Sequence, residues 1–126
     1  MSSVELQPAP AHIEAILEIM RPTAYRLLVR LLKLGEQTKG GIYLPENARK
    51  AHEAASQMAV VLAMGAAAYR EYERFPCGPY CQVGDTVLMR EYSGTRFCID
   101  GEEYRLINDD TVEAVIYQPE RITRAV

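Results

Sequence analysis

Apolar positions near the start of the chain follow a helical rhythm. They recur at i, i+3, i+4 and i+7, and the residues at these positions are Ile13, Ile16, Leu17 and Met20. Glu14 and Glu18 fall on the other side of the predicted helix. This spacing predicts a short amphipathic helix that ends before Pro22. The apolar stripe of such a helix needs a covering surface. That surface is either the rest of this chain, a neighbouring copy of it, or a dedicated partner.

After this helix the pattern changes to short apolar runs separated by turn residues. Residues 25–34 and 57–64 are rich in aliphatic side chains and predict strands, the second of them buried. Four more strands are predicted, at 86–92, 95–99, 102–107 and 111–117. The hairpin signals Ser93-Gly94 and Asp100-Gly101 separate the first three of these strands. Short strands at this spacing, without a strand–helix–strand rhythm, predict an all-β barrel.

Two long stretches do not fit either rhythm. Residues 35–56 are polar and broken by glycine and proline, and an irregular stretch of this length in a small domain is usually functional or disordered. Inside it lies one apolar island, Ile42-Tyr43-Leu44, which is costly to expose unless another surface covers it. Residues 66–74 fit a helical turn or a strand, and residues 75–81 a turn or loop. The tail after Pro119 is predicted to be loosely held.

Composition narrows the class of protein. The chain has 126 residues, which corresponds to one domain, and its net charge of −3 argues against a strongly basic nucleic-acid binder or a polybasic membrane patch. A chain of this size buries a modest core, so a small barrel that gains stability by assembling would fit. The three cysteines, the lack of a signal-peptide pattern and the short apolar stretches predict a soluble cytoplasmic protein without nucleic-acid or membrane partners.

Several motifs are similar to known functional sites but are incomplete. The run from Gly35 to Gly41 opens like a phosphate-binding loop, but the positions that need Lys and Ser or Thr hold Gly41 and Ile42. Cys77 and Cys81 are four residues apart and are inert thiols, a loop disulfide or, least favoured, part of a metal site. The only other ligand candidates, Cys98, His12 and His52, are far away in sequence. No catalytic constellation is found, so we expect no enzyme activity and no bound cofactor.

One motif is part of a resemblance to a known protein family that extends over roughly residues 21–117. It is the run Lys39-Gly40-Gly41-Ile42-Tyr43-Leu44-Pro45-Glu46. It follows a first strand at 25–33, and further matching segments come after it in the same order, at 60–65, 83–88, 91–95, 100–104 and 108–115. In this order the segments resemble the small co-chaperonins of the GroES type, the lids of chaperonin folding chambers.

The resemblance implies a fold and a set of roles. The fold is a partly open β-barrel over residues 21–118, with a mobile loop at 34–56 and a roof segment at 66–82, flanked by an N-terminal extension (1–20) and a C-terminal tail (119–126). In the mobile loop, Ile42, Tyr43 and Leu44 would contact the chaperonin, while Gly35, Gly40 and Gly41 would let the loop bend. The first strand of one copy would pair with the last strand of the next, through Leu27, Val29, Leu31, Val112 and Val115.

The implied activity is to cap a nucleotide-bound chaperonin ring of the GroEL type and to enclose a client protein for folding. Seven copies would form the lid, and ATP would be bound by the chaperonin rather than by this chain. The long N-terminal extension and a roof segment without the usual glycine-rich tip favour a divergent or phage-encoded member, which would act in the host cytoplasm. The alternative is a self-assembling structural ring without a chaperonin, in which the loop would be ordered in the isolated protein.

Overall fold

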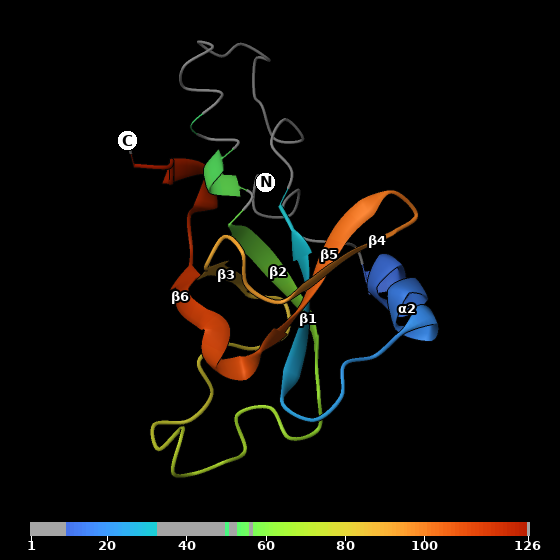
Figure 1. Cartoon of the computed structure of the whole chain (residues 1–126), viewed down its shortest axis with the longest axis vertical. Coiled ribbons are helices and arrows are strands. Elements are labelled where there is room, and N and C mark those ends of the chain that lie inside the picture. Colours follow the sequence, from blue (N-terminus) through green and yellow to red (C-terminus); the bar gives the residue numbers. More distant parts are fainter. Residues whose placement is uncertain (1–9, 33–49, 51–52, 56, 126) are drawn as a thin grey trace.

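Six antiparallel strands form one sheet in the order β4-β5-β1-β2-β3-β6 (Figure 1). The structure is a computed structural model that describes residues 10–32, 50, 53–55 and 57–125. The strands are β1 (Arg26–Leu31), β2 (Met58–Met64), β3 (Thr86–Met89), β4 (Thr95–Ile99), β5 (Glu102–Asn108) and β6 (Val112–Ile116). Within the described ranges the sheet does not close, and β4 and β6 form its edges. The prediction of a partly open, all-β barrel is therefore confirmed.

Most predicted strands agree with the structure to within a residue or two. β4 covers the predicted 95–99, whereas β3 ends at Met89, three residues before the predicted end. The reason is a turn: the backbone N–H of Ser93 donates to the Arg90 carbonyl at 3.3 Å, and the Ser93 hydroxyl donates to the same oxygen at 2.7 Å. The predicted Asp100-Gly101 hairpin turn is also present, with positive φ at both residues, as a tight two-residue turn requires.

The central strands β1 and β2 are buried on both faces of the sheet. Successive side chains of a strand point to opposite faces. Leu27 and Val29 accordingly contribute to one buried cluster, whereas Leu28 and Leu32 contribute to the other. This explains why the first two strands show nearly continuous apolar runs rather than an alternation of apolar and polar residues.

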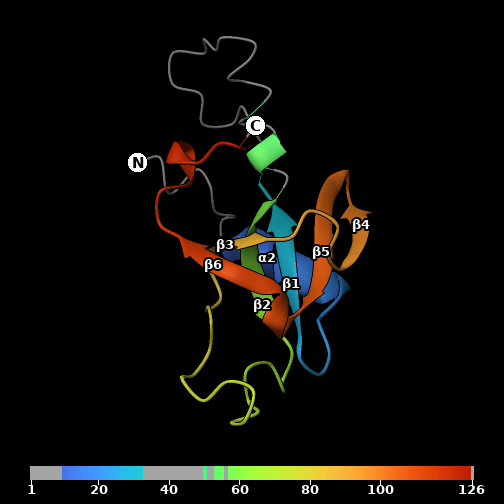
Figure 2. The same ribbon diagram turned by 60° about the vertical axis from the view of Figure 1, so that its left-hand side comes forward.

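A different part of the chain covers each face. On one face, Tyr69, Phe75 and Cys81 from the 66–82 segment join the cluster of Leu27 and Val29. On the other face lies α2 (Pro10–Ile19), whose Ile16 is only 4% exposed and packs with Leu28 and Tyr104. Figure 2 shows this helix against the sheet beside β1, β2 and β5. The helix prediction is confirmed, and the surface that covers its apolar stripe is the protein's own sheet.

The C-terminal tail is held, which corrects the prediction of a loose end. Pro119 is buried at the start of a short 3-10 helix, η2 (Pro119–Arg121), and Ile122 packs against the same cluster as Ile16. Arg124 pairs with Glu91 at 2.9 Å. Proline at the start of the turn fixes the backbone so that the following residues return to the barrel.

The packing of α2 yields the first prediction. Replacing Ile16 by alanine removes a buried side chain from the second cluster, so the free energy of unfolding should fall by about 2–4 kcal/mol in a urea titration. Glu18→Ala changes an exposed position on the same helix and serves as the matched control. Equal stability of the two variants would show that α2 does not cover this face.

Candidate functional site

The predicted chaperonin-binding residues, Ile42, Tyr43 and Leu44, lie outside the described residues, as do the predicted hinges Gly35, Gly40 and Gly41. The structure does describe the chain on both sides of this segment. The backbone N–H of Leu32 donates to the carbonyl of Met58 at 3.0 Å, and both residues are buried. Leu32 and Met58, which flank the predicted loop, are therefore fastened to each other, at the end of the sheet opposite the 66–82 segment (Figures 1 and 2).

The structure shows where the predicted inter-subunit strands lie in the sheet. Leu27 pairs with Met64 of β2 and with Ile107 of β5, and Val29 likewise has a partner on each side. Leu31 pairs with Ala59 and is buried in the core. β1 lies in the middle of the sheet, so Leu27 and Val29 have no free side on which a strand of a neighbouring copy could pair. Alternation of side chains indicates which face a residue occupies but not which strands lie beside it.

The last strand, β6, has a different place in the sheet from β1. β6 pairs with β3 on one side, and within the described part of the chain its other side is an edge of the sheet. Val112 is buried and Val115 is partly buried against the first cluster. A pocket of about 430 Å³ lies along this strand, lined by Val112, Glu113, Ala114 and the ring of Tyr80. β6 is therefore positioned to accept an added strand, whereas β1 is not.

The predicted roof segment, 66–82, is a series of turns rather than a helix or a strand. It follows Gly65, where a side chain would collide with the backbone of Thr23 and Ala24. The backbone N–H of Gly65 donates to the Arg26 carbonyl at 2.8 Å, and that of Ala67 donates to the Ala24 carbonyl at 2.9 Å. These two hydrogen bonds fasten the start of the roof segment to the residues at and just before the start of β1.

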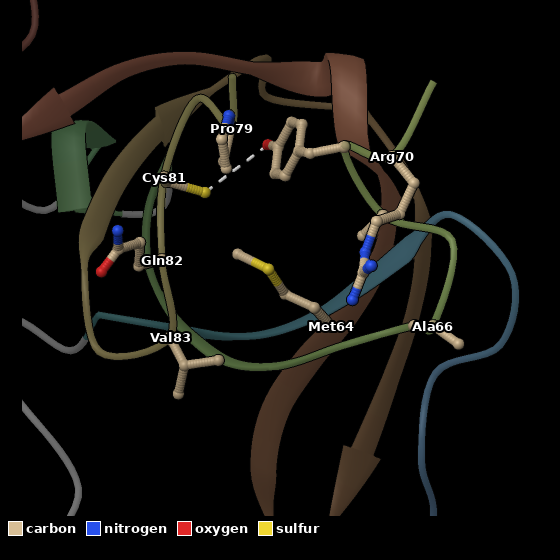
Figure 3. Close-up of a pocket in the computed structure, with 10 residues that line it drawn as sticks. Met64, Ala66, Arg70, Pro79, Cys81, Gln82 and Val83 are labelled. Carbon is tan, nitrogen blue, oxygen red and sulfur yellow. Dashed lines mark hydrogen bonds between the residues drawn. The ribbon is translucent and has the colours of Figure 1, made fainter. Parts of the chain in front are cut away.

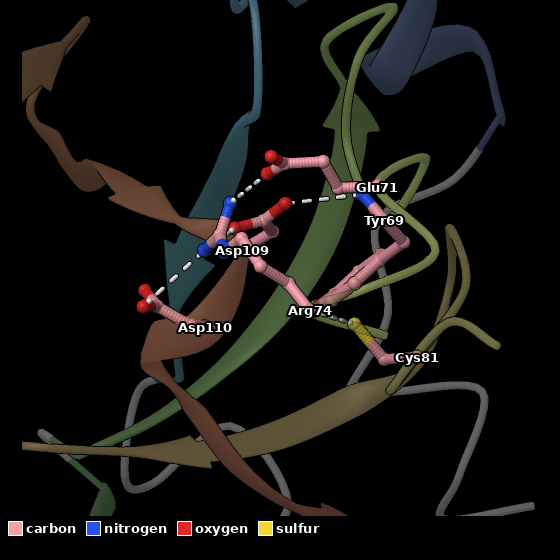
Figure 4. A network of polar contacts seen from close by, with 6 residues as sticks. All are labelled: Tyr69, Glu71, Arg74, Cys81, Asp109 and Asp110. Atoms are coloured by element: carbon pink, nitrogen blue, oxygen red, sulfur yellow. Dashed lines mark hydrogen bonds and ion pairs between the residues drawn. The ribbon is translucent and has the colours of Figure 1, made fainter. Parts of the chain in front are cut away.

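A buried carboxylate holds the middle of the roof segment (Figure 4). Asp109, which is 0% exposed, accepts the backbone N–H of Tyr69 at 3.0 Å and the guanidinium of Arg74 at 3.1 Å. Arg74 also reaches Glu71 and Asp110. The backbone of Tyr69 has φ +58°, which non-glycine residues rarely adopt, so the hydrogen bond to Asp109 holds a strained position.

Three aromatic rings complete the attachment of this segment. Tyr69, Phe75 and Tyr80 contact one another with ring centroids 4.9–5.4 Å apart, and the Arg74 guanidinium lies 4.8 Å from the centroid of Phe75. Burial raises the pKa of the Tyr69 hydroxyl, so it stays protonated. No motif in the sequence marks Asp109 as a buried anchor. The contact between Tyr69 and Asp109 joins positions forty residues apart, so no local pattern in the sequence predicts it.

A second pocket, of about 360 Å³, lies at the base of the roof segment and is drawn in Figure 3. Met64, Arg70 and Cys81 are among the residues that line it. The Cys81 sulfur lies 3.5 Å from the Tyr69 hydroxyl oxygen, and burial raises the pKa of the thiol. Cys81 is therefore a protonated core thiol rather than a nucleophile.

The cysteines do not pair in the structure. Cys77, Cys81 and Cys98 are all free, which favours the first of the three readings of the Cys77–Cys81 motif. Across the described residues, no three His, Cys, Asp or Glu side chains come together as metal ligands would. The side chain of His12 and all of His52 lie outside the described part of the chain. Among the described helices, none has the length and apolar character needed to cross a membrane.

Comparison with known proteins agrees with this geometry. Residues 19–116 match the family model described as Chaperonin 10 Kd subunit. The chain is 33% identical to a co-chaperonin GroES of Trichlorobacter lovleyi over 98 residues, which covers 77% of this chain and 96% of that protein. It is 35% identical to a co-chaperonin GroES of Gemmatimonas aurantiaca, with 75% and 92% covered. For that of Methylacidiphilum infernorum the identity is 36%, with 77% and 93% covered. The match, which includes all six strands and both ends of the predicted loop, shows that this chain belongs to the Chaperonin 10 Kd subunit family.

Proposed function

We propose that this protein is a co-chaperonin that caps a nucleotide-bound chaperonin ring of the GroEL type and encloses a client protein for folding. The observation that supports this best is the hydrogen bond between Leu32 and Met58, which brings both ends of the 34–56 segment to one end of the barrel. Ile42, Tyr43 and Leu44, which would contact the chaperonin, belong to the segment between these two residues. ATP is bound by the chaperonin, and the co-chaperonin itself carries out no reaction.

The apolar trio supplies the binding energy. Ile42 and Leu44 would each contribute about 1.5–3 kcal/mol if fully buried against the chaperonin. Ordering the loop costs about 1–2 kcal/mol for each backbone residue that becomes fixed, so a single loop binds weakly. Several loops on one lid raise the effective concentration of the others and can increase affinity by ~10²–10⁴ for each linked site. Weak single contacts also let the lid leave when the chaperonin changes state.

Assembly into a ring of seven copies is the second part of the proposal. The outer side of β6, bordered by the pocket under Tyr80, supports a contact with the neighbouring copy. Pairing there would remove an exposed sheet edge, which otherwise invites uncontrolled association. Because β1 has partners on both sides, the segment that the neighbour contributes is not β1.

The 66–82 segment is the third part. It lies at the end of the sheet opposite the loop ends (Figures 1 and 2), so in a lid whose loops point toward the chaperonin it forms the roof of the chamber. The contacts of Asp109 with Tyr69 and Arg74 support a roof of fixed shape. Such a roof would keep its form when a client presses against it.

The binding role of the trio can be tested directly. The double variant Ile42→Ser, Leu44→Ser should lose co-elution with a bacterial chaperonin in the presence of nucleotide, because both anchors become polar. Its oligomeric state, read by native mass spectrometry, should stay unchanged. Gln37→Ser in the same segment is the matched control. If the double variant still supports refolding of a client, the anchor assignment is wrong. If the unaltered protein never co-elutes with chaperonin, the structural-ring alternative is favoured.

The roof attachment gives a prediction with an internal control. Asp109→Ala leaves the buried N–H of Tyr69 without its acceptor and removes the closest of the three carboxylates that pair with Arg74. We expect a loss of about 2–4 kcal/mol in unfolding free energy and faster proteolysis within 66–82. Asp110→Ala removes an exposed partner of the same arginine, 3.3 Å away, and should cost under about 1 kcal/mol. Similar losses for both variants would contradict the proposed role of Asp109.

A further inference from the structure

The C-terminal tail lies outside the part of the chain that matches the family, which ends at residue 116. It is nevertheless built into the molecule. Pro119 is buried, and the η2 turn is closed by the backbone N–H of Ile122, which donates to the Pro119 carbonyl at 3.1 Å. This turn directs the last residues back over the barrel toward the end where the predicted loop begins and ends. Figures 1 and 2 show the red tail beside the green helical turn at residues 53–55.

The tail contacts the C-terminal root of the predicted loop. The backbone N–H of Arg124 donates to the carbonyl of Lys50 at 3.3 Å. Ile122 packs against the buried cluster that contains Ala54 and Ala55, which follow Lys50 in the chain. These contacts join the tail to Lys50 and to the cluster that contains Ala54 and Ala55.

The tail is itself fastened to the rigid part of the barrel. The Arg124 guanidinium donates to a carboxylate oxygen of Glu91 at 2.9 Å, and this hydrogen bond lowers the pKa of Glu91. The carbonyl of Glu91 accepts a hydrogen bond from Arg105 of β5 at 2.6 Å. Arg105 is 3% exposed and cannot move freely. Arg124 therefore connects the loop root to a fixed point on the sheet.

We propose that the C-terminal tail, residues 118–125, is a positioning element that fixes Lys50 and residues 53–55 to the barrel and thereby raises the affinity of the lid for chaperonin. The Leu32–Met58 hydrogen bond fixes only the two residues that flank this stretch, and the contacts of the tail add Lys50 and residues 53–55 as further fixed points. Backbone that is fixed before binding adds nothing to the ordering entropy that binding costs. The second half of the inference rests on the proposed co-chaperonin function; the first half concerns the free protein alone.

Hydrogen exchange on the free protein tests the first half. Arg124→Pro removes both the backbone donor and the guanidinium, whereas Arg124→Ala removes only the guanidinium. In Arg124→Pro the amides of residues 53–57 should exchange at least about fivefold faster, with a smaller change in Arg124→Ala, while β1 and β2 keep their protection. Arg121→Ala is the matched control, because this exposed arginine of the same tail bonds only Gln118 among the described contacts. Deletion of residues 123–126, which keeps Pro119 and Ile122, should reproduce Arg124→Pro.

Titration of a bacterial chaperonin in the presence of nucleotide tests the second half. Because several loops act together, the Arg124→Pro lid should bind about tenfold or more weakly, with an unchanged number of copies in the ring. Unaltered exchange at 53–57 in both Arg124→Pro and the deletion would overturn the inference. Faster exchange with unchanged affinity would refute the positioning role but leave the proposed function intact. Absence of binding by the unaltered lid would refute the proposed function and, with it, the affinity claim.

Discussion

Burial of the two central strands on both faces is the constraint on which the rest of this molecule depends. β1 and β2 expose almost no surface, so the sheet needs a cover on each side. A chain of this size has little apolar surface to spare. Segments outside the sheet therefore provide the cover for its two faces. The N-terminal helix and the tail cover one face, and the roof segment covers the other. The extensions beyond the family region are therefore part of the core.

This sharing of the core links regions that have separate tasks in the proposed lid. Tyr69 and Phe75 belong to the roof and also to the cluster around Leu27 and Val29. Ala54 and Ala55 belong to the root of the predicted loop and also to the cluster around Leu28. A change in packing at the centre of the sheet reaches both ends of the barrel. The two faces nevertheless remain distinct, since they share a sheet but not a cluster.

Much of the fold could be predicted from the sequence because its signals are local. Apolar rhythm located α2 and the strands, and Asp100-Gly101 marked a hairpin. Three features depend on long-range contacts and were not predictable. The neighbours of β1 follow from topology, the anchoring of Tyr69 depends on a carboxylate forty residues later, and the tail is held through Lys50 and Glu91. The order of motifs indicated the family, but the roles of Ile42, Tyr43 and Leu44 lie outside the described residues and stay proposals.

The place of β1 in the sheet also bears on how the chain reaches its native state. β1 is the first strand to be synthesised, yet one of its partners, β5, begins only at Glu102. Pairs so distant in sequence form slowly, because a large loop must close before they gain any contact. A nascent chain on the ribosome would carry β1 with an uncovered edge until residues 102–108 had emerged. A protein proposed to shelter the folding of others thus has, in its own synthesis, a long period in which it is exposed to aggregation.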